Sequence, residues 1–354
     1  MSEKFLMKGN EALAASAIAA GCRFYFGYPI TPQTELAAYM AKTMPKIGGT
    51  FLQAESEIAA INMVYGAAAA GARAMTSSSS PGVSLKGEGV SYMAGADLPG
   101  VIINVERGGP GLGSIQPSQQ DYWQATRALG HGGYRKIVYA PSTVQEMADY
   151  AYLAFDKADE YLMPVMLLAD GLLGQMMEPV ELPEAKTDFP EKPWATTGTK
   201  GRREHNIANS LYLAPDELER KIRDRQGRYD KIVECEQRSE GFMLDDAEIV
   251  LVAFGASSRI SRTAVVKARE AGIKAGLLRP ITLWPYPTKA LEATLDHAKG
   301  FLSVEMNEGQ MVEDVRLAIH DQRPVEFYGR TGGMIPTPAE VLGAIQKLAE
   351  RVGD

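Results

Sequence analysis

The alternation of short apolar segments with helical segments is the feature that most limits how this chain folds. In residues 1 to about 180, five apolar runs each stop at Gly, Pro or Ser: CRFYFGYP, ARAMTSSSS, GVIINVERGG, RKIVYAPS and PVMLLADG. Between them lie patterns typical of helices, at 34–44, 55–71, 82–95, 118–130 and 142–160. Strands that alternate with helices form parallel sheets with helices on both faces. The sequence therefore predicts an α/β fold with a doubly wound parallel sheet.

The alternation resumes near Glu248 after a segment of different composition. The intervening segment is rich in proline and charge and carries a strongly charged helical pattern at 215–238, as in a linker or an arm that lies on another surface. After it, EIVLVAFGASS, IKAGLLRPITLWP and FLSVEMNEG predict three strands, and the helical patterns lie at 258–271 and 338–351. We expect three parts: a domain of residues 1–180, a charged linker or helical arm of residues 181–245, and a smaller α/β domain of residues 246–354.

Charge and cysteine content exclude several classes of protein. The chain has 354 residues and a net charge of −7, without a basic stripe, which argues against a nucleic-acid-binding protein. Its 2 cysteines can form neither a disulfide framework nor a four-cysteine cluster, so any iron–sulfur chemistry requires another chain. The 4 histidines are scattered without metal-ligand spacing. We therefore expect no protein metal site in this chain.

The N-terminal run ALAASAIAAGC faintly resembles a signal peptide, but it is better read as a helix. Polar residues interrupt its approach, and the run is alanine rather than leucine. We expect a helix capped by Asn10, with Ala12 to Ala20 packed closely on the sheet. No run reaches the roughly 18 apolar residues that a membrane span needs. The sequence therefore predicts a cytoplasmic protein with no membrane partner.

Candidate functional residues fall where the predicted strands end. In an open parallel sheet, ligands bind beyond the carboxyl ends of the strands. Five candidates stand at such positions: Thr31, Glu57, the loop TSSSSPG (76–82), Arg107 and the ADG of 169–171. Each one taken singly could instead serve only a turn or a helix cap.

Thr31 lies in YPITP, between two prolines. Each proline fixes its own φ angle and pushes the preceding residue toward extended geometry. The backbone around Thr31 is therefore held almost rigid, which favours a hydroxyl that must be placed accurately.

Glu57 begins a predicted helix that is unusually rich in small residues, namely Ala59, Ala60, Gly66, Ala67, Ala70 and Gly71. Such a helix packs very closely, as at an interface between two similar domains. A glutamate at its start is then partly desolvated, which is a common setting for proton transfer. The alternative is that Glu57 only complements the helix dipole.

Arg107 follows the apolar strand GVIINVE and begins RGGPGLG. Its planar guanidinium suits a carboxylate at a strand end, although an exposed arginine at a turn is the alternative. The glycines that follow lack the spacing of a dinucleotide fingerprint, which excludes a Rossmann NAD site. In TSSSSPG, capping of the next helix by Ser80 is as plausible as contact with an anionic or polar ligand.

LLADGLLGQ is similar to the GDG motif with which thiamine diphosphate enzymes hold magnesium and diphosphate, but the match is incomplete. Ala169 replaces the first glycine, and the next asparagine, Asn206, lies far downstream. Asp170 is therefore interpreted as the end of the last strand of the first domain.

Together these motifs closely resemble the α subunits of 2-oxoacid:ferredoxin oxidoreductases, which are thiamine diphosphate enzymes with a YPITP motif. The resemblance rests on YPITP, ESEIAAINMVYGAAAAGARAMTSSSSPG and RGGPGLG, and extends to LLRPITLWPYP and EMNEGQM near the C-terminus. It runs essentially end to end and is nearest to the branched-chain and 2-oxoglutarate types. The resemblance implies a pyrimidine-binding domain of the thiamine enzymes, followed by a domain like the C-terminal domain of transketolases.

The same resemblance implies a role for individual residues. Glu57 would hydrogen-bond the aminopyrimidine of thiamine diphosphate, Thr31 would face the reacting carbonyl, and Arg107 would hold the substrate carboxylate. Thr31 and Glu57 are thus the implied catalytic residues. The other implied contacts are Tyr28 to the substrate and Pro29, Ile30, Ser79 and Ser80 to the cofactor.

Cofactors and partners are implied by what the chain lacks relative to its family. Without a complete GDG motif or cluster cysteines, it resembles one half of a divided active site. A β subunit would supply the GDG…Asn motif, Mg²⁺, the diphosphate site and a [4Fe-4S] cluster. Separate γ and small ferredoxin-like δ subunits would complete the enzyme, because YPITP begins at residue 28 and leaves no room for a γ domain ahead of it. RGGPGLGSIQPSQQD departs from the usual pattern at Gln116, where some relatives carry Arg or Thr.

The implied reaction is the oxidative decarboxylation of a 2-oxoacid to acyl-coenzyme A and CO2, with electrons passed through partner clusters to ferredoxin. We favour 3-methyl-2-oxobutanoate as substrate, with 2-oxoglutarate next. The second substrate needs a further cation for its distal carboxylate, which Arg127, Lys86 or a β-subunit residue could supply. The alternatives are a thiamine lyase without electron transfer, which would need the diphosphate motif in this chain, and a scaffolding subunit, which would be expected to lose Glu57, Thr31 or Arg107.

Overall fold

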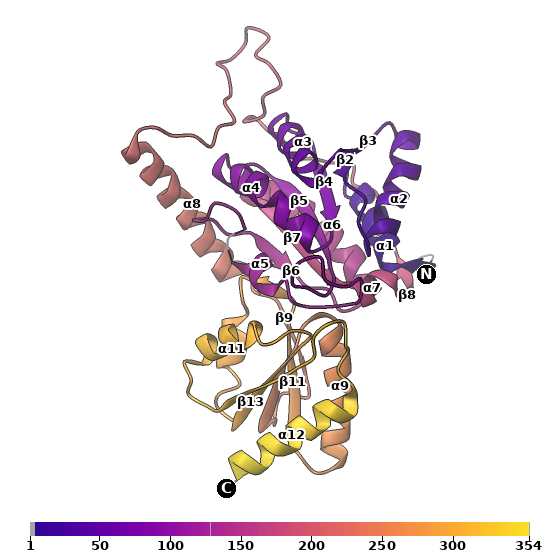
Figure 1. Cartoon of the computed structure of the whole chain (residues 1–354). Helices are drawn as coiled ribbons and strands as arrows, with labels where there is room; N and C mark the ends of the chain where they lie inside the picture. The colour runs from indigo at the N-terminus through magenta and orange to yellow at the C-terminus, as the bar shows by residue number, and fades with distance from the viewer. Residues whose placement is uncertain (1–3, 128, 354) are drawn as a thin grey trace.

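The computed structural model describes residues 4–127 and 129–353 and contains two stacked α/β units. The upper unit in Figure 1 holds a seven-stranded sheet and the lower unit a five-stranded sheet, with the C-terminus at its far end. No helix in these residues combines the length and the apolarity that a membrane span requires.

The first sheet has the strand order β12-β6-β7-β5-β4-β2-β3. Its strands are β2 (Phe24–Gly27), β3 (Thr50–Gln53), β4 (Ala74–Ser78), β5 (Gly100–Glu106), β6 (Ile137–Tyr139), β7 (Pro164–Asp170) and β12 (Thr282–Trp284). All neighbours are parallel except β12 and β6. Every residue of β4, β5 and β7 is buried, because both faces of these central strands are covered. The predicted doubly wound parallel sheet is confirmed.

Helices cover the two faces of this sheet in two groups. One group is α1 (Gly9–Ala19), α2 (Thr34–Thr43) and α6 (Val144–Tyr161), and the other is α3 (Glu57–Ala69) and α4 (Pro81–Gly95). Alternate residues of β5 belong to the two resulting cores, Ile103 to the first and Ile102 to the second. The α3–α4 side thus forms a separate layer, on which Glu57 lies.

Elements beside α1 depart from the prediction. The chain opens with β1 (Lys4–Lys8), which pairs antiparallel with β8 (Met177–Glu181), and the short elements η1 (Met44–Ile47) and α7 (Gly171–Gln175) also occur. The expected cap at Asn10 is wrong, since α1 begins at Gly9 and Asn10 lies inside its first turn. The Asn10 amide instead donates to Pro32 O at 2.8 Å, because this buried amide is satisfied by the neighbouring loop.

The second sheet has the strand order β14-β13-β10-β11-β9. Its strands are β9 (Ser239–Phe242), β10 (Ile249–Val252), β11 (Ala275–Pro280), β13 (Gly300–Glu305) and β14 (Val325–Gly329), and its helices are α9 (Gly255–Glu270), α10 (Thr288–Glu292), α11 (Met311–Ile319) and α12 (Pro338–Gly353). Helix α9 begins at Gly255 rather than at 258. The first strand of this sheet along the chain, β9, lies inside the range 181–245 that was predicted from composition to be a linker.

The run IKAGLLRPITLWP is divided between the two sheets. It forms β11 in the second sheet and then β12, which pairs antiparallel with β6 of the first sheet. Ile281 separates the two strands, and its carbonyl accepts a hydrogen bond from Ala140 N at 2.8 Å. The prediction of a single strand is therefore wrong, because pairing with the distant β6 draws the second half of the run away.

The helix predicted at 118–130 is also largely wrong, because the second unit binds its first residues in a non-helical form. Among its described residues, only α5 (Tyr122–Thr126) is helical, and residue 128 lies outside them. Gln119 is buried, its backbone N donates to Met306 O at 3.0 Å, and its side chain accepts from Ser257 Oγ at 2.8 Å and donates to Phe254 O at 2.9 Å. The segment before α5 is therefore pinned between the two units.

Replacing Gln119 with Leu should reduce the free energy of unfolding by about 2–4 kcal/mol, since each buried polar group left without a partner costs about 1–3 kcal/mol. Chemical denaturation of the purified chain measures this change. Gln116→Leu is the matched control, because Gln116 lies three residues earlier in the same segment and its side chain is exposed. Equal stability of the two variants would contradict the pinning role of Gln119.

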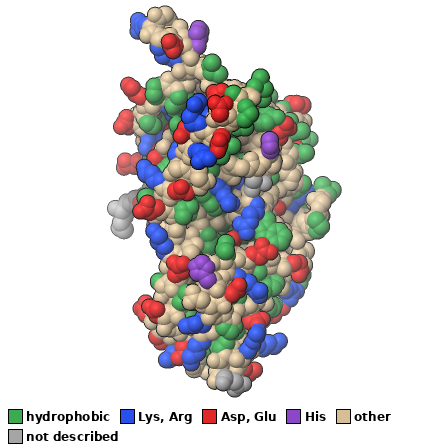
Figure 2. All heavy atoms as spheres, turned by 90° about the vertical axis from the view of Figure 1, so that its left-hand side faces the viewer, with side chains coloured by type: hydrophobic (Ala, Val, Ile, Leu, Met, Phe, Trp, Pro, Cys, Tyr) green, Lys and Arg blue, Asp and Glu red, His purple; other side chains and the backbone are tan. Residues whose placement is uncertain are grey.

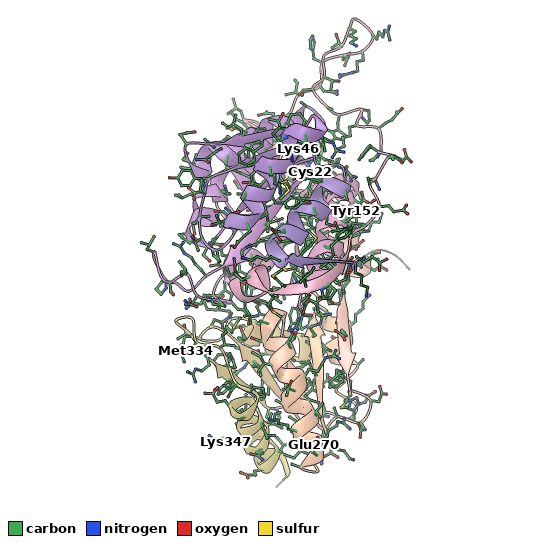
Figure 3. The ribbon with its side chains drawn as sticks, turned by 90° about the vertical axis from the view of Figure 1, so that its right-hand side faces the viewer. Cys22, Lys46, Tyr152, Glu270, Met334 and Lys347 are labelled. Carbon is green, nitrogen blue, oxygen red and sulfur yellow. The ribbon has the colours of Figure 1, made fainter. Side chains whose placement is uncertain are left out.

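The charged helix of the linker lies on the first unit. Helix α8 (Pro215–Cys235) places Arg225 in a buried position, where it donates to Asp97 at 3.0 Å and to Gly95 O at 3.0 Å. Residues 196–213 extend from the top of the first unit in Figure 1. Figure 2 shows acidic and basic side chains interspersed on this face rather than gathered into one patch. The helix is thus an arm held by buried guanidinium contacts.

Candidate active site at the carboxyl edge of the first sheet

The predicted site residues follow four adjacent parallel strands. Tyr28 to Thr31 follow β2, Glu57 follows β3, Ser79 and Ser80 follow β4, and Arg107 follows β5, in the sheet order β5-β4-β2-β3. Because the strands are parallel, these residues lie along one edge of the sheet. The topology therefore gathers them although they are far apart in the sequence.

The loop after β2 is exposed at its tip and held at its backbone. Tyr28, Pro29 and Thr31 are exposed and Ile30 is half-buried. The carbonyl of Pro32 accepts from the Asn10 amide at 2.8 Å and from the Gln175 amide at 3.3 Å. The rigidity predicted from the two prolines is thus reinforced by side chains from two other elements, while the Thr31 side chain remains accessible.

Gln33 is a residue of this loop that the sequence did not single out. It is fully buried, its Oε1 accepts from Ser77 Oγ at 2.6 Å, and the Ser77 hydroxyl shares a 2.7 Å hydrogen bond with Tyr25 OH. Its Nε2 donates to Tyr28 O at 3.4 Å. A buried polar chain therefore connects the sheet interior to the exposed loop. The sequence signal that could have identified Gln33 is its place directly after Pro32 and before the first residue of α2.

Arg107 joins the loops after β2 and β5. Its guanidinium donates to Thr31 O at 3.1 Å and to Leu112 O at 2.9 Å, and the residue is only 7% exposed. The alternative of an exposed arginine at a turn is therefore wrong. Its Nε has no hydrogen-bond partner among the described residues, so the guanidinium keeps donors in reserve. Arg107 therefore lies directly beside Thr31.

The serine loop after β4 contacts Arg107 rather than capping α4. Ser80 accepts a hydrogen bond on Oγ from Arg107 N at 3.0 Å and donates to Asp121 Oδ2 at 2.6 Å. Its φ of 28° and the absence of any bond from its side chain to the start of α4 show that the capping alternative is wrong. Ser79 is fully buried, and its hydroxyl has no partner among the described residues. The loop therefore offers an unused hydroxyl next to the arginine site.

Glu57 lies at the first turn of α3 and is 6% exposed. Ser56 caps this helix by accepting from Ala59 N at 3.2 Å, so Glu57 is not needed as the cap. A Cβ added at Gly82 would lie 2.6 Å from Glu57 Oε1 and would also collide with Ser78 Oγ. Only glycine at position 82 therefore leaves room for the carboxylate between α3 and α4.

The candidates form two groups. Arg107 is hydrogen-bonded to both Thr31 and Ser80, and these three residues form the first group. Glu57 instead lies next to Ser78 and Gly82. Within the described residues no hydrogen bond joins Glu57 to the first group. The serine loop between Ser78 and Ser80 links the two. The site is thus a row of groups along the sheet edge rather than one contact cluster.

Buried carboxylates behind the arginine were not expected from the sequence. Glu106 accepts from Asp121 N at 3.0 Å, and burial together with the charge of Asp121 raises the pKa of Glu106 well above its usual range. Burial also raises the pKa of Asp121, against hydrogen bonds from Ser80 and Asn104. Asp121 thus holds the serine loop through Ser80, and Glu106 in turn holds Asp121.

The residues present fit the pyrimidine end of thiamine diphosphate but not its metal-bound end. A buried carboxylate at Glu57, an unpaired buried hydroxyl at Ser79 and an accessible Thr31 match a polar ring with substrate beside it. In residues 4–127 and 129–353 no group of three or more His, Cys, Asp or Glu side chains is arranged to hold a metal ion. Asp170 of the ADG segment instead accepts from Leu172 N, Leu173 N and Ala256 N, which commits it to the contact between the two units.

Two family models match successive parts of the chain. Residues 15–234 match the family described as "Pyruvate flavodoxin/ferredoxin oxidoreductase, thiamine diP-bdg". Residues 247–341 match "Pyruvate:ferredoxin oxidoreductase core domain II".

Individual proteins similar to this chain are oxidoreductase subunits. The ketoisovalerate oxidoreductase subunit VorB of Methanothermobacter thermautotrophicus is 49% identical over 350 residues, which cover 99% of this chain and 98% of VorB. The 2-oxoglutarate synthase subunit KorA of the same organism is 38% identical, covering 98% of this chain and 100% of KorA.

Two solved structures share the fold. The 2-oxoglutarate:ferredoxin oxidoreductase from Magnetococcus marinus, solved with 2-oxoglutarate, coenzyme A and succinyl-CoA bound, superposes with a TM-score of 0.87 at 26% identity, and the match covers 98% of this chain but 65% of that one. An inactive split-gene transketolase tetramer matches at a TM-score of 0.61 and 15% identity, which shows the fold alone. With two family matches and a relative 49% identical over nearly its whole length, this chain belongs to the family of thiamine diphosphate-binding 2-oxoacid:ferredoxin oxidoreductase subunits.

Proposed function

We propose that this chain is the α subunit of a coenzyme A-acylating 2-oxoacid:ferredoxin oxidoreductase, which converts a 2-oxoacid to acyl-coenzyme A and CO2 and passes the electrons to ferredoxin. The observation that carries this proposal is the row of Arg107, Thr31, Ser80 and Glu57 along one sheet edge, with an arginine and a carboxylate both buried there. A scaffolding subunit has no need to bury these charges at a ligand-binding edge, since a buried charge costs stability.

Each of these residues has a distinct proposed role. Glu57 would accept a hydrogen bond from the protonated ring nitrogen of the aminopyrimidine, and Ser79, Ser80, Pro29 and Ile30 would line the cofactor. Thiamine diphosphate, when bound, supplies the nucleophilic carbon and the electron sink for decarboxylation. A carboxylate held by Gly82 and close helix packing needs little reorganisation when the ring binds.

The substrate would lie beside Arg107 and Thr31. The remaining donors of Arg107 would hold the 2-oxoacid carboxylate, while the Thr31 hydroxyl donates to the 2-oxo oxygen and Tyr28 covers the site. Because Arg107 also donates to Thr31 O at 3.1 Å, the guanidinium holds the backbone of Thr31 beside it. Such prior placement of reacting groups lowers the entropic cost of the reaction.

A partner β subunit would supply the other half of the site. It would carry the GDG…Asn motif with Mg²⁺ and diphosphate and a [4Fe-4S] cluster, while γ and ferredoxin-like δ subunits complete the path of electrons. The small residues of α3 and its exposed Ile58 suit close packing against such a subunit. We place the complex in the cytoplasm. We propose residues 1–180 as the pyrimidine-binding domain, 181–245 as the linker and arm, and 246–354 as the transketolase-like domain, although β9 of the linker range joins the second sheet and β12 of the last range joins the first.

We propose 3-methyl-2-oxobutanoate as the preferred substrate. Of the two candidate cations in this chain, Arg127 pairs with Asp314 at 3.2 Å, and Lys86 is unpaired but completely buried, so neither offers an accessible and unpaired charge to a distal carboxylate. The loop bound to Arg107 instead exposes two apolar side chains, Leu112 at 81% and Ile115 at 59%. These would cover a branched alkyl chain better than a second carboxylate.

The test is an anaerobic purification of the complex through a tag on this chain, followed by 2-oxoacid-dependent dye reduction. We expect a brown eluate with a smaller chain that carries GDG…Asn and cluster cysteines. We further expect kcat/KM for 3-methyl-2-oxobutanoate to exceed that for 2-oxoglutarate by about 10²-fold or more, since an unpaired buried carboxylate is strongly rejected. Equal or better use of 2-oxoglutarate would overturn the substrate assignment. A complex without 2-oxoacid oxidation would overturn the function.

A further inference from the structure

Lys86 is an unusual residue in the layer formed by α3 and α4. It lies in the middle of α4 with 0% of its side chain exposed, and its Nζ has no hydrogen-bond partner among the described residues. Lysines are almost never fully buried unless they are paired, because an isolated buried ammonium is expensive. A charged group held in this way needs a compensating neighbour or a function.

The position of Lys86 on α4 identifies that neighbour. Residues 82, 86 and 89 lie on one face of the helix, because they are four and three positions apart. At one end of this face, a Cβ added at Gly82 would lie 2.6 Å from Glu57 Oε1, and at the other end a Cβ at Gly89 would lie 2.5 Å from Ile61 of α3. Lys86 therefore lies on the face that packs against the first turns of α3, where Glu57 begins the helix.

The electrostatics agree with this placement. Burial lowers the pKa of Lys86 to about 8, and the negative charge of Glu57 opposes that change. The two groups do not form a direct ion pair within the described residues, since Lys86 Nζ has no partner. Their interaction thus acts through space in a layer from which water is largely excluded, where charges are weakly screened.

We propose that Lys86 is a positioning residue for Glu57, the cationic neighbour whose charge compensates the buried Glu57 carboxylate where that carboxylate accepts the protonated pyrimidine nitrogen. The inference rests on the proposed role of Glu57. A buried carboxylate without an opposite charge nearby is costly, whereas a nearby positive charge stabilises the ionised form. Only the ionised form makes a charge-assisted hydrogen bond to the ring, which is roughly twice as strong as a neutral one.

The experiment compares Lys86→Met with Lys86→Arg in the complex purified through this chain. After removal of the bound cofactor, thiamine diphosphate affinity is measured by fluorescence titration at steps from about pH 6 to about pH 9, a range that spans the lowered pKa of Lys86. We expect Lys86→Met to bind the cofactor about tenfold more weakly at the acidic end and to approach the wild type at the basic end. Lys86→Arg should match the wild type at the acidic end but keep tight binding at the basic end, because arginine stays charged where Lys86 loses its proton. Lys46→Met, at an exposed lysine, is the matched control.

Thermal unfolding separates this role from a structural one. The pKa of Lys86 is lower in the folded chain than its ordinary value of 10.5, so its charge destabilises the fold fully below about pH 8 and less as the pH rises toward 10.5. Lys86→Met should therefore unfold at a higher temperature than the wild type at neutral pH, despite its weaker cofactor binding. Should this variant not assemble, Lys86→Gln is measured in the same way.

The possible results distinguish a failure of the inference about Lys86 from a failure of the proposed function. A Lys86→Met or Lys86→Gln complex with the wild-type pH profile of cofactor affinity overturns the inference, as does an equal loss at every pH accompanied by a lower unfolding temperature. Failure of the wild-type complex to bind thiamine diphosphate at any pH would instead overturn the proposed function.

Discussion

Glu57→Gln should lower kcat of the assembled complex by about 10²–10⁴-fold, which is the range that a positioned proton-transfer group contributes. The amide keeps the shape of the side chain between α3 and α4 but cannot carry the negative charge that stabilises a protonated pyrimidine nitrogen. Its packing should survive, because Ser56 rather than Glu57 caps the helix, accepting from Ala59 N at 3.2 Å. Steady-state dye reduction with saturating 2-oxoacid and coenzyme A measures the change.

The matched control for Glu57 is Glu55→Gln, two residues earlier and exposed. It removes the same charge from the same region and should leave kcat unchanged. Near-normal turnover of Glu57→Gln in a complex that contains its full complement of thiamine diphosphate would remove Glu57 from the mechanism. Cofactor content therefore has to be determined for each preparation before rates are compared.

Arg107→Lys should raise KM for the 2-oxoacid by about 10–100-fold, because a hydrogen bond to a charged group contributes about 1.5–3 kcal/mol. Lysine keeps the charge but loses the planar fork, so it cannot bind a carboxylate while also donating to Thr31 O and Leu112 O, at 3.1 and 2.9 Å. Thiamine diphosphate affinity should change little, since Glu57 lies in a separate group of contacts. Initial rates over a range of 2-oxoacid concentrations give KM directly.

Arg107 also supports the loop, so a second variant isolates that part of its effect. Asn10→Ala removes the 2.8 Å hydrogen bond to Pro32 O in the same loop without removing a proposed substrate contact. It should lower stability and change KM less than Arg107→Lys does. If the two variants raise KM equally, Arg107 acts by supporting the loop and not by holding the substrate carboxylate.

Much of the first domain could be predicted because its signals are local. The sequence predicted nine elements of this domain to within a few residues: the strands β2, β4, β5, β6 and β7 and the helices α2, α3, α4 and α6. These predictions succeed because the periodicity of a strand or helix depends only on the residues of that one segment. The ends of those strands then identified Thr31, Glu57 and Arg107 as candidates, because parallel strands place their carboxyl ends at one edge. Their roles remain predictions until the variants above are measured.

The errors share one physical cause, which is competition from distant parts of the chain. The helix expected at 118–130 is mostly lost because Gln119 binds Met306 and Ser257 of the second unit. The run from 273 to 285 is divided because β12 pairs with β6. In both cases a long-range hydrogen bond outweighs a local preference of less than about 1 kcal/mol per residue.

By itself the sequence determined the alternation of strands and helices, the rigid loop around Thr31 and the family to which the motifs are similar. Only the tertiary structure decided which side chains meet: the contact of Arg107 with Thr31 O, the hydrogen bond of Arg107 N to Ser80 Oγ, and the burial of Lys86 on the face of α4 that packs against α3. The reason is that periodicity and turn chemistry act over a few residues, whereas burial and charge pairing depend on segments brought together by the sheet.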